Sequence, residues 1–217
     1  VITLALGIGA NTAIFSVVNA ALLRPLPYRE PDQLVYVWSA EKARGIPQTP
    51  VSIPDLRDWR EQTQVFEGIA AFSQGKFNLS GGREPILVTG LAATANIFDV
   101  LGVKPELGRS FRPGEQEWGR HRVVILSHAL WLQSFGGDRD IVGKTITLNA
   151  DPRTVIGVLP AGFEAPESKI QLWVPASSPP DIPVARNDRF LRVVARLKPG
   201  VSVERARSDM DTITSRL

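Results

Sequence analysis

The sequence predicts an α+β protein in which a membrane-spanning helix precedes a water-soluble domain. Three observations support this prediction. The first 23 residues contain no charged side chain, and Arg24 is the first ionisable residue. The rest of the chain combines short strand-type apolar segments with segments whose apolar residues recur at three- and four-residue spacing, which is typical of amphipathic helices. Glycine- and proline-rich stretches separate these elements, as expected of turns and loops.

Residues 1–23 are long enough to cross a membrane. As a helix they would reach about 35 Å at a rise of about 1.5 Å per residue, against a hydrocarbon core of about 30 Å. A cleaved signal peptide is the alternative, but it requires a small-residue cleavage site after the apolar stretch. Residues 22–27 (LLRPLP) offer no such site, so the sequence favours a membrane helix.

Small residues recur along one face of this predicted helix. Ala5, Gly9 and Ala13 lie four residues apart, a spacing that lets one membrane helix pack closely on another. Residues 7–12 also resemble a glycine-rich phosphate loop, but that motif requires a preceding strand and a glycine or alanine at its last position. Thr12 occupies that position, so helix packing is the favoured interpretation.

The exit from the predicted membrane helix, Arg24 to Tyr28, is expected to be stiff. Pro25 and Pro27 each fix their own φ angle and disfavour helix at the residue before them. A stiff connection transmits a movement that a flexible linker would absorb. We therefore identify Arg24, Pro25 and Pro27 as candidate coupling residues between the membrane and the domain.

The strongest helix signal begins at Ser52. Ser52 is expected to be the N-cap, Asp55 occupies the capping-box position, and Pro54 lies in the first turn, where its missing N–H costs nothing. Residues at three- and four-residue spacing would form one apolar face of this helix: Leu56, Trp59, Thr63, Phe66 and Ala70.

Strands and further helices follow in order along the chain. Strands are predicted at residues 33–39, 76–79, 86–92, 123–126, 144–148, 154–158, 172–175 and 190–197. Loops are predicted at 40–51 and 177–188, and a four-residue turn at 149–152. A short helix at 96–101 would end at Gly102, and a helix capped by Ser127 would end at the glycine pair that follows Phe135.

The last predicted helix opens at Ser202. Its apolar residues again recur at helical spacing and would need a partner surface: Val203, Ala206, Met210, Ile213 and Leu217. We expect this helix and the Ser52 helix to pack on the same sheet.

Composition excludes several classes of function. The net charge is +3, and the lysines and arginines are scattered rather than clustered, which is atypical of nucleic-acid-binding proteins. Cysteine is absent, so neither a disulfide framework nor a cysteine-based zinc site is available.

Catalytic constellations are not evident. Ser127 and His128 are adjacent, but neighbours at a helix start usually point apart, and serine is a common N-cap. His121 and His128 are the only histidines, and the residues around them lack the spacing of a metal site. Four acids are expected in solvated loops: Glu115, Glu117, Asp138 and Asp140. Three tryptophans are expected in the core: Trp59, Trp131 and Trp173.

Several segments, in the same order along nearly the whole chain, resemble MacB-type permeases of ABC transporters, and in particular the duplicated orphan permeases that share their extracytoplasmic core domain. The segments are ALGIGANTAIFS at 5–16, LLRPLPY at 22–28, NIFDVLGV at 96–103, LGR at 107–109, VILS at 124–127, FGGD at 135–138, VIGVLP at 155–160 and RLKPGVS at 196–202. Two departures fall in turns. Ala150 stands where the family usually has glycine, and Arg139 stands where proline is common.

The resemblance implies a two-lobed periplasmic core domain. A membrane-proximal α/β lobe would be built from two separated segments, with a β-rich lobe inserted between them. In this chain it implies a transmembrane helix at 1–23, proximal segments at 24–103 and 184–217, and an inserted lobe at 104–183.

The resemblance also implies a transport-linked permease in the bacterial inner membrane, with this domain on the periplasmic side. ATP would be bound and hydrolysed by a cytoplasmic ATPase subunit, so no cofactor, metal or catalytic residue is expected in this chain. Further partners would be a second permease half, as a homodimer or an internal duplicate, and a periplasmic adaptor or outer-membrane channel. The alternative is an FtsX-like scaffold that recruits or switches a partner such as a cell-wall hydrolase. Neither function involves nucleic acid.

Overall fold

The computed structural model describes residues 28–41, 46–80, 85–167 and 169–216. The strands are β1 (Leu34–Val37), β2 (Ser39–Glu41), β3 (Ile46–Thr49), β4 (Phe66–Ser80), β5 (Ile86–Ala93), β6 (Leu107–Gly108), β7 (Val123–Leu126), β8 (Thr145–Leu148), β9 (Asp151–Val158), β10 (Leu172–Pro175) and β11 (Arg192–Leu197). The helices are α2 (Ile53–Gln62), α3 (Ile97–Leu101), α4 (His128–Phe135) and α5 (Val203–Thr214), with short 3-10 turns at Pro31–Gln33 and Arg139–Ile141. The predicted membrane helix at 1–23 lies outside the described residues. Within the described ranges, no helix is long and apolar enough to cross a membrane.

A mixed sheet of nine strands organises the fold. Its order is β1-β11-β4-β5-β10-β7-β9-β6, and β8 pairs with both β4 and β9. The pairing β4-β5-β10-β7-β9-β8 therefore returns to β4 and closes a ring of six strands. A separate hairpin is formed by β2 and β3.

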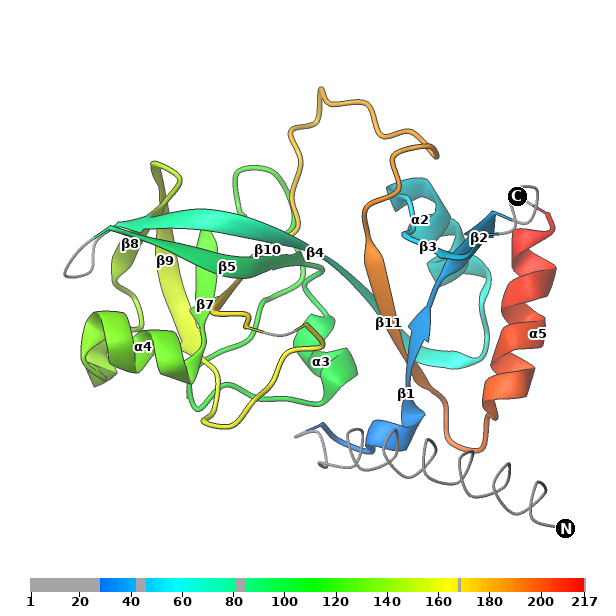
Figure 1. Cartoon of the computed structure of the whole chain (residues 1–217), viewed down its shortest axis with the longest axis horizontal. Coiled ribbons are helices and arrows are strands. Elements are labelled where there is room, and N and C mark those ends of the chain that lie inside the picture. Colours follow the sequence, from blue (N-terminus) through cyan, green and yellow to red (C-terminus); the bar gives the residue numbers. More distant parts are fainter. Residues whose placement is uncertain (1–27, 42–45, 81–84, 168, 217) are drawn as a thin grey trace, which may run out of the picture.

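The long strand β4 joins the two halves of the molecule (Figure 1). Its first part pairs with β11, with Ala70 opposite Val194. Its far end pairs with β8, with Leu79 opposite Leu148. Most of its length also pairs with β5, so one continuous hydrogen-bonded ladder runs from the α2–α5 half into the closed ring.

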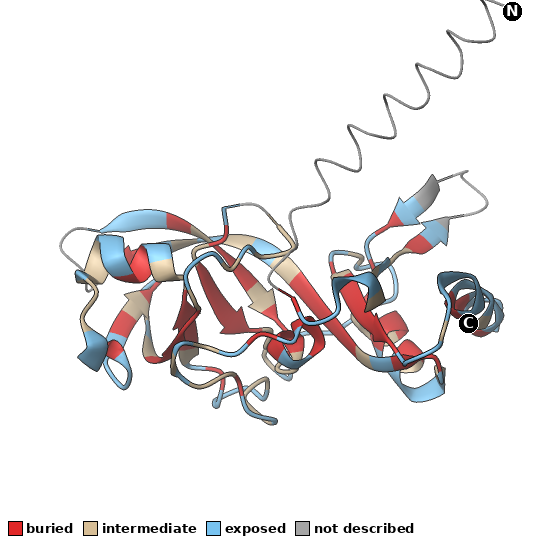
Figure 2. Cartoon of the chain, turned by 90° about the horizontal axis from the view of Figure 1, so that it is seen from below, coloured by how far each residue is buried: buried red, intermediate tan, exposed pale blue. Residues whose placement is uncertain are grey.

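Three apolar clusters form the core, and alternate residues of the strands face different clusters. One cluster packs α2 and α5 against β4 and β11 and confirms the expectation that both helices cover the same sheet. A central cluster lies on the opposite face of β4 and β11, around α3. The third cluster joins α4 to the ring. Figure 2 shows the buried residues concentrated in the strands and on the inner sides of the helices.

The predicted serine N-caps and glycine helix ends are confirmed. The Asp55 carboxylate, predicted to complete a capping box with Ser52, instead accepts a hydrogen bond from Arg186. The hydroxyls of Ser52, Ser127 and Ser202 each accept the backbone N–H three residues further on. Gly102 and Gly136 end α3 and α4 with φ angles of 71° and 65°. These signals are local, so the sequence alone defines where three helices begin and two end.

The predicted extent of the Ser52 helix was wrong. The helix ends at Gln62, where Thr63 turns to an extended conformation, and Phe66 and Ala70 belong to β4. A spacing of four residues fits both a helix face and one face of a strand. Pairing with β11 decides in favour of the strand, and the predicted short strand at 76–79 is the far end of this 15-residue strand.

Three further predictions are corrected. Part of the predicted loop at 40–51 forms β3, which pairs with β2. The turn after β8 consists of Asn149 and Ala150 alone, both with positive φ, because Asp151 and Pro152 already pair with β8. Val203 is 54% exposed, whereas Ala206, Met210 and Ile213 are buried as expected. The predicted lobe boundaries stay a prediction. Leu79 and Val88, placed in the proximal segment by the sequence, pack in the ring cluster with residues of the predicted insert.

Candidate functional site

The sequence-predicted site residues lie outside the described ranges: Ala5, Gly9, Ala13, Arg24, Pro25 and Pro27. Tyr28, which follows them directly, is anchored in the domain. Its side chain is 8% exposed, its hydroxyl donates to the Glu164 carbonyl at 2.7 Å, and its ring packs edge-on against Phe163. Burial is the main cause that raises the pKa of the Tyr28 hydroxyl, and the nearby Tyr36 raises it further. The hydroxyl therefore remains a neutral donor at physiological pH.

Arg196 joins three parts of the fold around Tyr28. It lies on β11, is 1% exposed, and donates from Nε to the Val100 carbonyl of α3 at 2.8 Å and from Nη1 to the Glu30 carbonyl at 3.4 Å. Its Nη2 has no hydrogen-bond partner among the described residues. Burial is the main cause that lowers the pKa of Arg196, and the positive charge of Arg29 lowers it further. One buried cation thus ties the start of the domain to α3 and β11.

Gly102 gives the chain around Arg29 room to lie against α3. Its φ is 71°, and a Cβ there would lie 2.4 Å from Cβ of Arg29. The Arg29 guanidinium reaches across to Glu67 on β4 at 3.0 Å. We call the residues Tyr28, Arg29, Glu30, Gly102 and Arg196 the Tyr28 junction. They fix the first described residues of the domain to the sheet.

The adjacent Ser127 and His128 point to different partners. The Ser127 hydroxyl accepts the Leu130 N–H, whereas Nδ1 of His128 contacts a carboxylate oxygen of Glu106 at 2.5 Å. Within the described residues, no group of three or more potential ligands gathers as a metal site. Trp59, Trp131 and Trp173 are buried, as predicted for core residues.

A groove of about 940 Å³ lies between α2 and the segment that precedes β7. Figure 1 shows the loop of residues 176–191, which connects β10 to β11. Residues of this loop form another wall of the groove. Arg57 and Arg60 of α2 line one side, and Arg122 and Arg153 line the other. This groove brings together residues that are far apart in the sequence.

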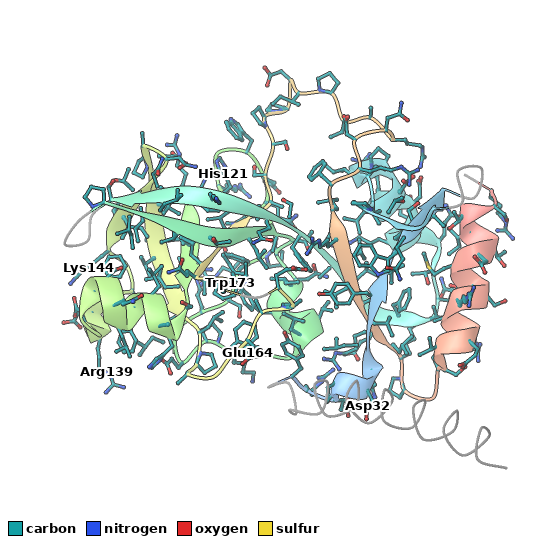
Figure 3. All side chains as sticks on the ribbon, viewed as in Figure 1. Asp32, His121, Arg139, Lys144, Glu164 and Trp173 are labelled. Carbon is teal, nitrogen blue, oxygen red and sulfur yellow. The ribbon has the colours of Figure 1, made fainter. Side chains whose placement is uncertain are left out.

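His121, labelled in Figure 3, lines this groove, and we expect it to make the stability of the fold depend on pH. It is 6% exposed, its ring stacks on Trp118, and its Nδ1 accepts the Gly119 N–H at 3.2 Å. Burial, followed by the charge of Arg153, lowers the pKa of His121 below 6.5. The unfolded chain therefore binds this proton more readily than the folded chain.

We expect this shift to destabilise the protein in mild acid. The contribution of His121 is fully present above about pH 6.5 and is lost as the pH falls from there through the lower pKa of the folded state. Urea unfolding at pH 7, 6 and 5, followed by circular dichroism, measures the loss. His121→Gln should flatten the dependence in this range. An unchanged pH dependence in the variant would assign it to other groups.

A family model described as the MacB-like periplasmic core domain matches residues 1–213. The chain belongs to this family. The match confirms the family that the segment order indicated, and the chain is accordingly a MacB-like periplasmic domain of an ABC-type permease.

Solved structures share the fold at low sequence identity. The periplasmic region of MacB from Actinobacillus actinomycetemcomitans is 16% identical, with a TM-score of 0.64 over 84% of this chain and 82% of that one. A domain of a protein described as a permease from Porphyromonas gingivalis is 18% identical, with a TM-score of 0.65 over 87% and 86%. The extracellular domain of the noncanonic ABC-type transporter YknZ from Gram-positive bacteria is 18% identical, with a TM-score of 0.55 over 81% and 86%. A search of curated proteins found no match.

Sequence reasoning missed both the Tyr28 junction and the groove. An arginine within an apolar strand, Arg196, was the one available signal for the junction. Arg196 follows Val194 by two residues, so the period of a strand places both on the same face. The carbonyls that it binds lie 96 and 166 residues away, and no local pattern reveals them.

Proposed function

We propose that this domain relays ATP-driven movement across the bacterial inner membrane during export by an ABC-type permease. The domain itself makes and breaks no covalent bond. ATP would be bound and hydrolysed by a cytoplasmic ATPase subunit or domain. A second permease half, and a periplasmic adaptor or outer-membrane channel, would complete the transporter.

The Tyr28 junction is the observation that carries this proposal. Tyr28 directly follows the proline-containing segment, and its buried ring and hydroxyl are held by Phe163 and Glu164. Arg196 then connects the next residues to α3 and β11. A force applied at Tyr28 would therefore reach the β9–β10 connection through Phe163 and Glu164, and the sheet through Glu30 and Arg196.

The continuous sheet supports transmission as a rigid unit. β4 carries hydrogen bonds to β11, β5 and β8 along its 15 residues. The central cluster contains residues of both halves, including Ala70 and Val194 beside Ile125 and Trp173. Because packed cores deform little, we infer that the domain tilts or rotates as one body.

Transport by membrane vesicles that contain the whole permease and its ATPase tests the proposal. Compounds that move only when ATP is supplied would be identified by mass spectrometry, and ATP hydrolysis would be measured in parallel. We expect the double variant Pro25→Gly/Pro27→Gly to hydrolyse ATP but to lose most transport, because glycine removes the fixed φ angles. Unchanged coupling in this variant would contradict the relay.

The same experiment separates export from the FtsX-like scaffold. A scaffold would hydrolyse ATP without moving any compound, and the purified permease would instead activate a cell-wall hydrolase. That outcome would show that the permease acts as a scaffold and not as an exporter. It would remain consistent with a domain that relays ATP-driven movement.

A further inference from the structure

The groove between α2 and the segment preceding β7 gathers exposed apolar side chains. Trp118 is 55% exposed, Ile182 54%, Val184 43% and Phe190 48%, and all four line the groove. Large apolar side chains concentrated in one hollow usually mark a contact surface, whereas single ones scattered over a surface do not. One wall of the groove is therefore suited to an apolar ligand body.

The groove is also cationic. Asp151 is shared by Arg122 and Arg153, which approach its two oxygens at 3.2 Å each. One carboxylate thus faces two guanidinium groups at that end. On α2, Arg60 donates to the carbonyl of Ile69 and to the side-chain oxygen of Asn96, neither of which carries a charge.

Arg57 adds a further cation to the α2 side, and Glu61 is the acid that lines the groove there. Among the described lining residues, four arginines therefore face two carboxylates. The lowered pKa of His121 leaves that ring neutral near pH 7. Charge complementarity favours an anion in this groove over a cation or a neutral ligand.

Two buried polar atoms at the groove lack partners. Nε of Arg153 and Oγ of Ser177 form no hydrogen bond with any described residue. Buried donors without an acceptor are unfavourable, and the oxygens of an anionic group would satisfy both kinds of donor.

The loop that borders the groove is held in place. Arg186 contacts Asp55 at 2.7 Å and Asp58 at 2.6 Å, both on α2. Pro179, Pro180 and Pro183 further restrict the loop backbone. The groove is therefore preformed, and its volume of about 940 Å³ falls in the range of small-molecule sites, about 300–1,000 Å³.

We propose that this groove binds a small amphipathic anion, with its charged oxygens toward the arginines and its apolar body against Trp118, Ile182 and Phe190. Binding at this site is a function separate from the relay of movement. The proposal does not depend on whether the permease exports the bound molecule. A segment of another protein or a second copy of this chain would contact a broad surface rather than a groove with walls. The test below distinguishes these occupants from a small anion.

The test uses residues 28–217, which contain the three core clusters as far as the structure describes them. Decanoate is the probe, decan-1-ol is the uncharged control with the same chain length, and acetate is the control without an apolar body. Isothermal titration calorimetry should give one decanoate site with affinity in the micromolar range. Decan-1-ol and acetate should bind at least about tenfold more weakly, a difference of about 1.4 kcal/mol.

Matched variants locate the site. Arg57→Gln/Arg60→Gln and, separately, Trp118→Ala should each weaken decanoate binding at least about tenfold. Arg205→Gln/Arg207→Gln on α5 and Leu132→Ala on α4 replace exposed residues away from the groove and should leave binding unchanged. Circular dichroism confirms that each variant is folded. Because Trp118 is exposed, its variant keeps the test valid if the double arginine variant misfolds.

Three results would overturn the proposal. Equal binding of decan-1-ol and decanoate would show an apolar surface without selection for an anion. Unchanged decanoate affinity in the Trp118→Ala variant would place the ligand elsewhere. Self-association in analytical ultracentrifugation that Trp118→Ala abolishes would identify the groove as an interface between copies. The vesicle experiment on Pro25 and Pro27 is independent of all three.

Discussion

Trp173→Ala is expected to remove about 3–5 kcal/mol from the free energy of unfolding. Trp173, labelled in Figure 3, lies on β10 between β5 and β7 and is 1% exposed. Its ring packs against those of Phe98 and Phe163, with centroids 6.0 and 5.7 Å apart. Alanine would leave a cavity in the central cluster that joins the two halves. Domains of this size are stable by about 5–15 kcal/mol, so the loss is a large fraction of the total.

Urea unfolding of residues 28–217, followed by circular dichroism, measures this loss. Trp118→Ala is the matched control, because the same atoms are removed from a side chain that is 55% exposed. We expect the control to change stability by less than about 1 kcal/mol. A Trp173→Ala variant no less stable than the control would mean that the central cluster does not hold the halves together.

Gly102→Ala is expected to disturb the Tyr28 junction and with it the coupling of ATP hydrolysis to transport. The positive φ of 71° costs an alanine about 1–2 kcal/mol. The new Cβ would also lie 2.4 Å from Cβ and 3.2 Å from the backbone nitrogen of Arg29. The start of the domain must then move away from α3, which weakens the contacts of Glu30 with Arg196.

Gly136→Ala separates the cost of the positive φ angle from the effect of the contact with Arg29. Gly136 has a similar φ of 65°, but a Cβ there would meet no atom within 4 Å. We expect this control to lose only the backbone contribution and to keep full coupling in vesicles. Equal stability loss and equal coupling in the two variants would show that the approach of Gly102 to Arg29 has no part in transmission.

Local signals explain which elements could be predicted. A serine cap acts within three residues and a terminal glycine within one turn, so the starts of α2, α4 and α5 and the ends of α3 and α4 follow from the sequence. The end of α2 has no such signal, and it was predicted wrongly. The ladder of β4 depends on β11, which lies more than a hundred residues further on. The spacing of Phe66 and Ala70 also fits a helix face, and the residues between Ala70 and Lys76 carry no strand signal of their own, so this strand was predicted too short.

The candidate sites depend on contacts of the same long range. Arg196 is polar in a predicted strand, and its burial is explained by the distant carbonyls of Val100 and Glu30, to which it donates. The groove combines α2, the residues around His121 and the loop before β11. The sequence predicts a helix after Ser52, a solvated loop at Glu115 and Glu117 and a loop at 177–188, but no local pattern shows that these segments meet.

Pulsed electron–electron double resonance measures the distance between two spin labels. Applied to the assembled permease, it tests the rigid relay most directly. Residues 1–217 contain no cysteine, so Arg57→Cys adds one label to this domain, on α2. A second label is placed at the equivalent position of the other permease half, and any cysteine elsewhere in the permease is first replaced by serine. We expect the distance between halves to shift between the nucleotide-free and vanadate-trapped states. A label pair at Arg57 and Arg122 within this domain should keep its distance. Identical distances between halves in both states, with ATP hydrolysis intact, would contradict the account.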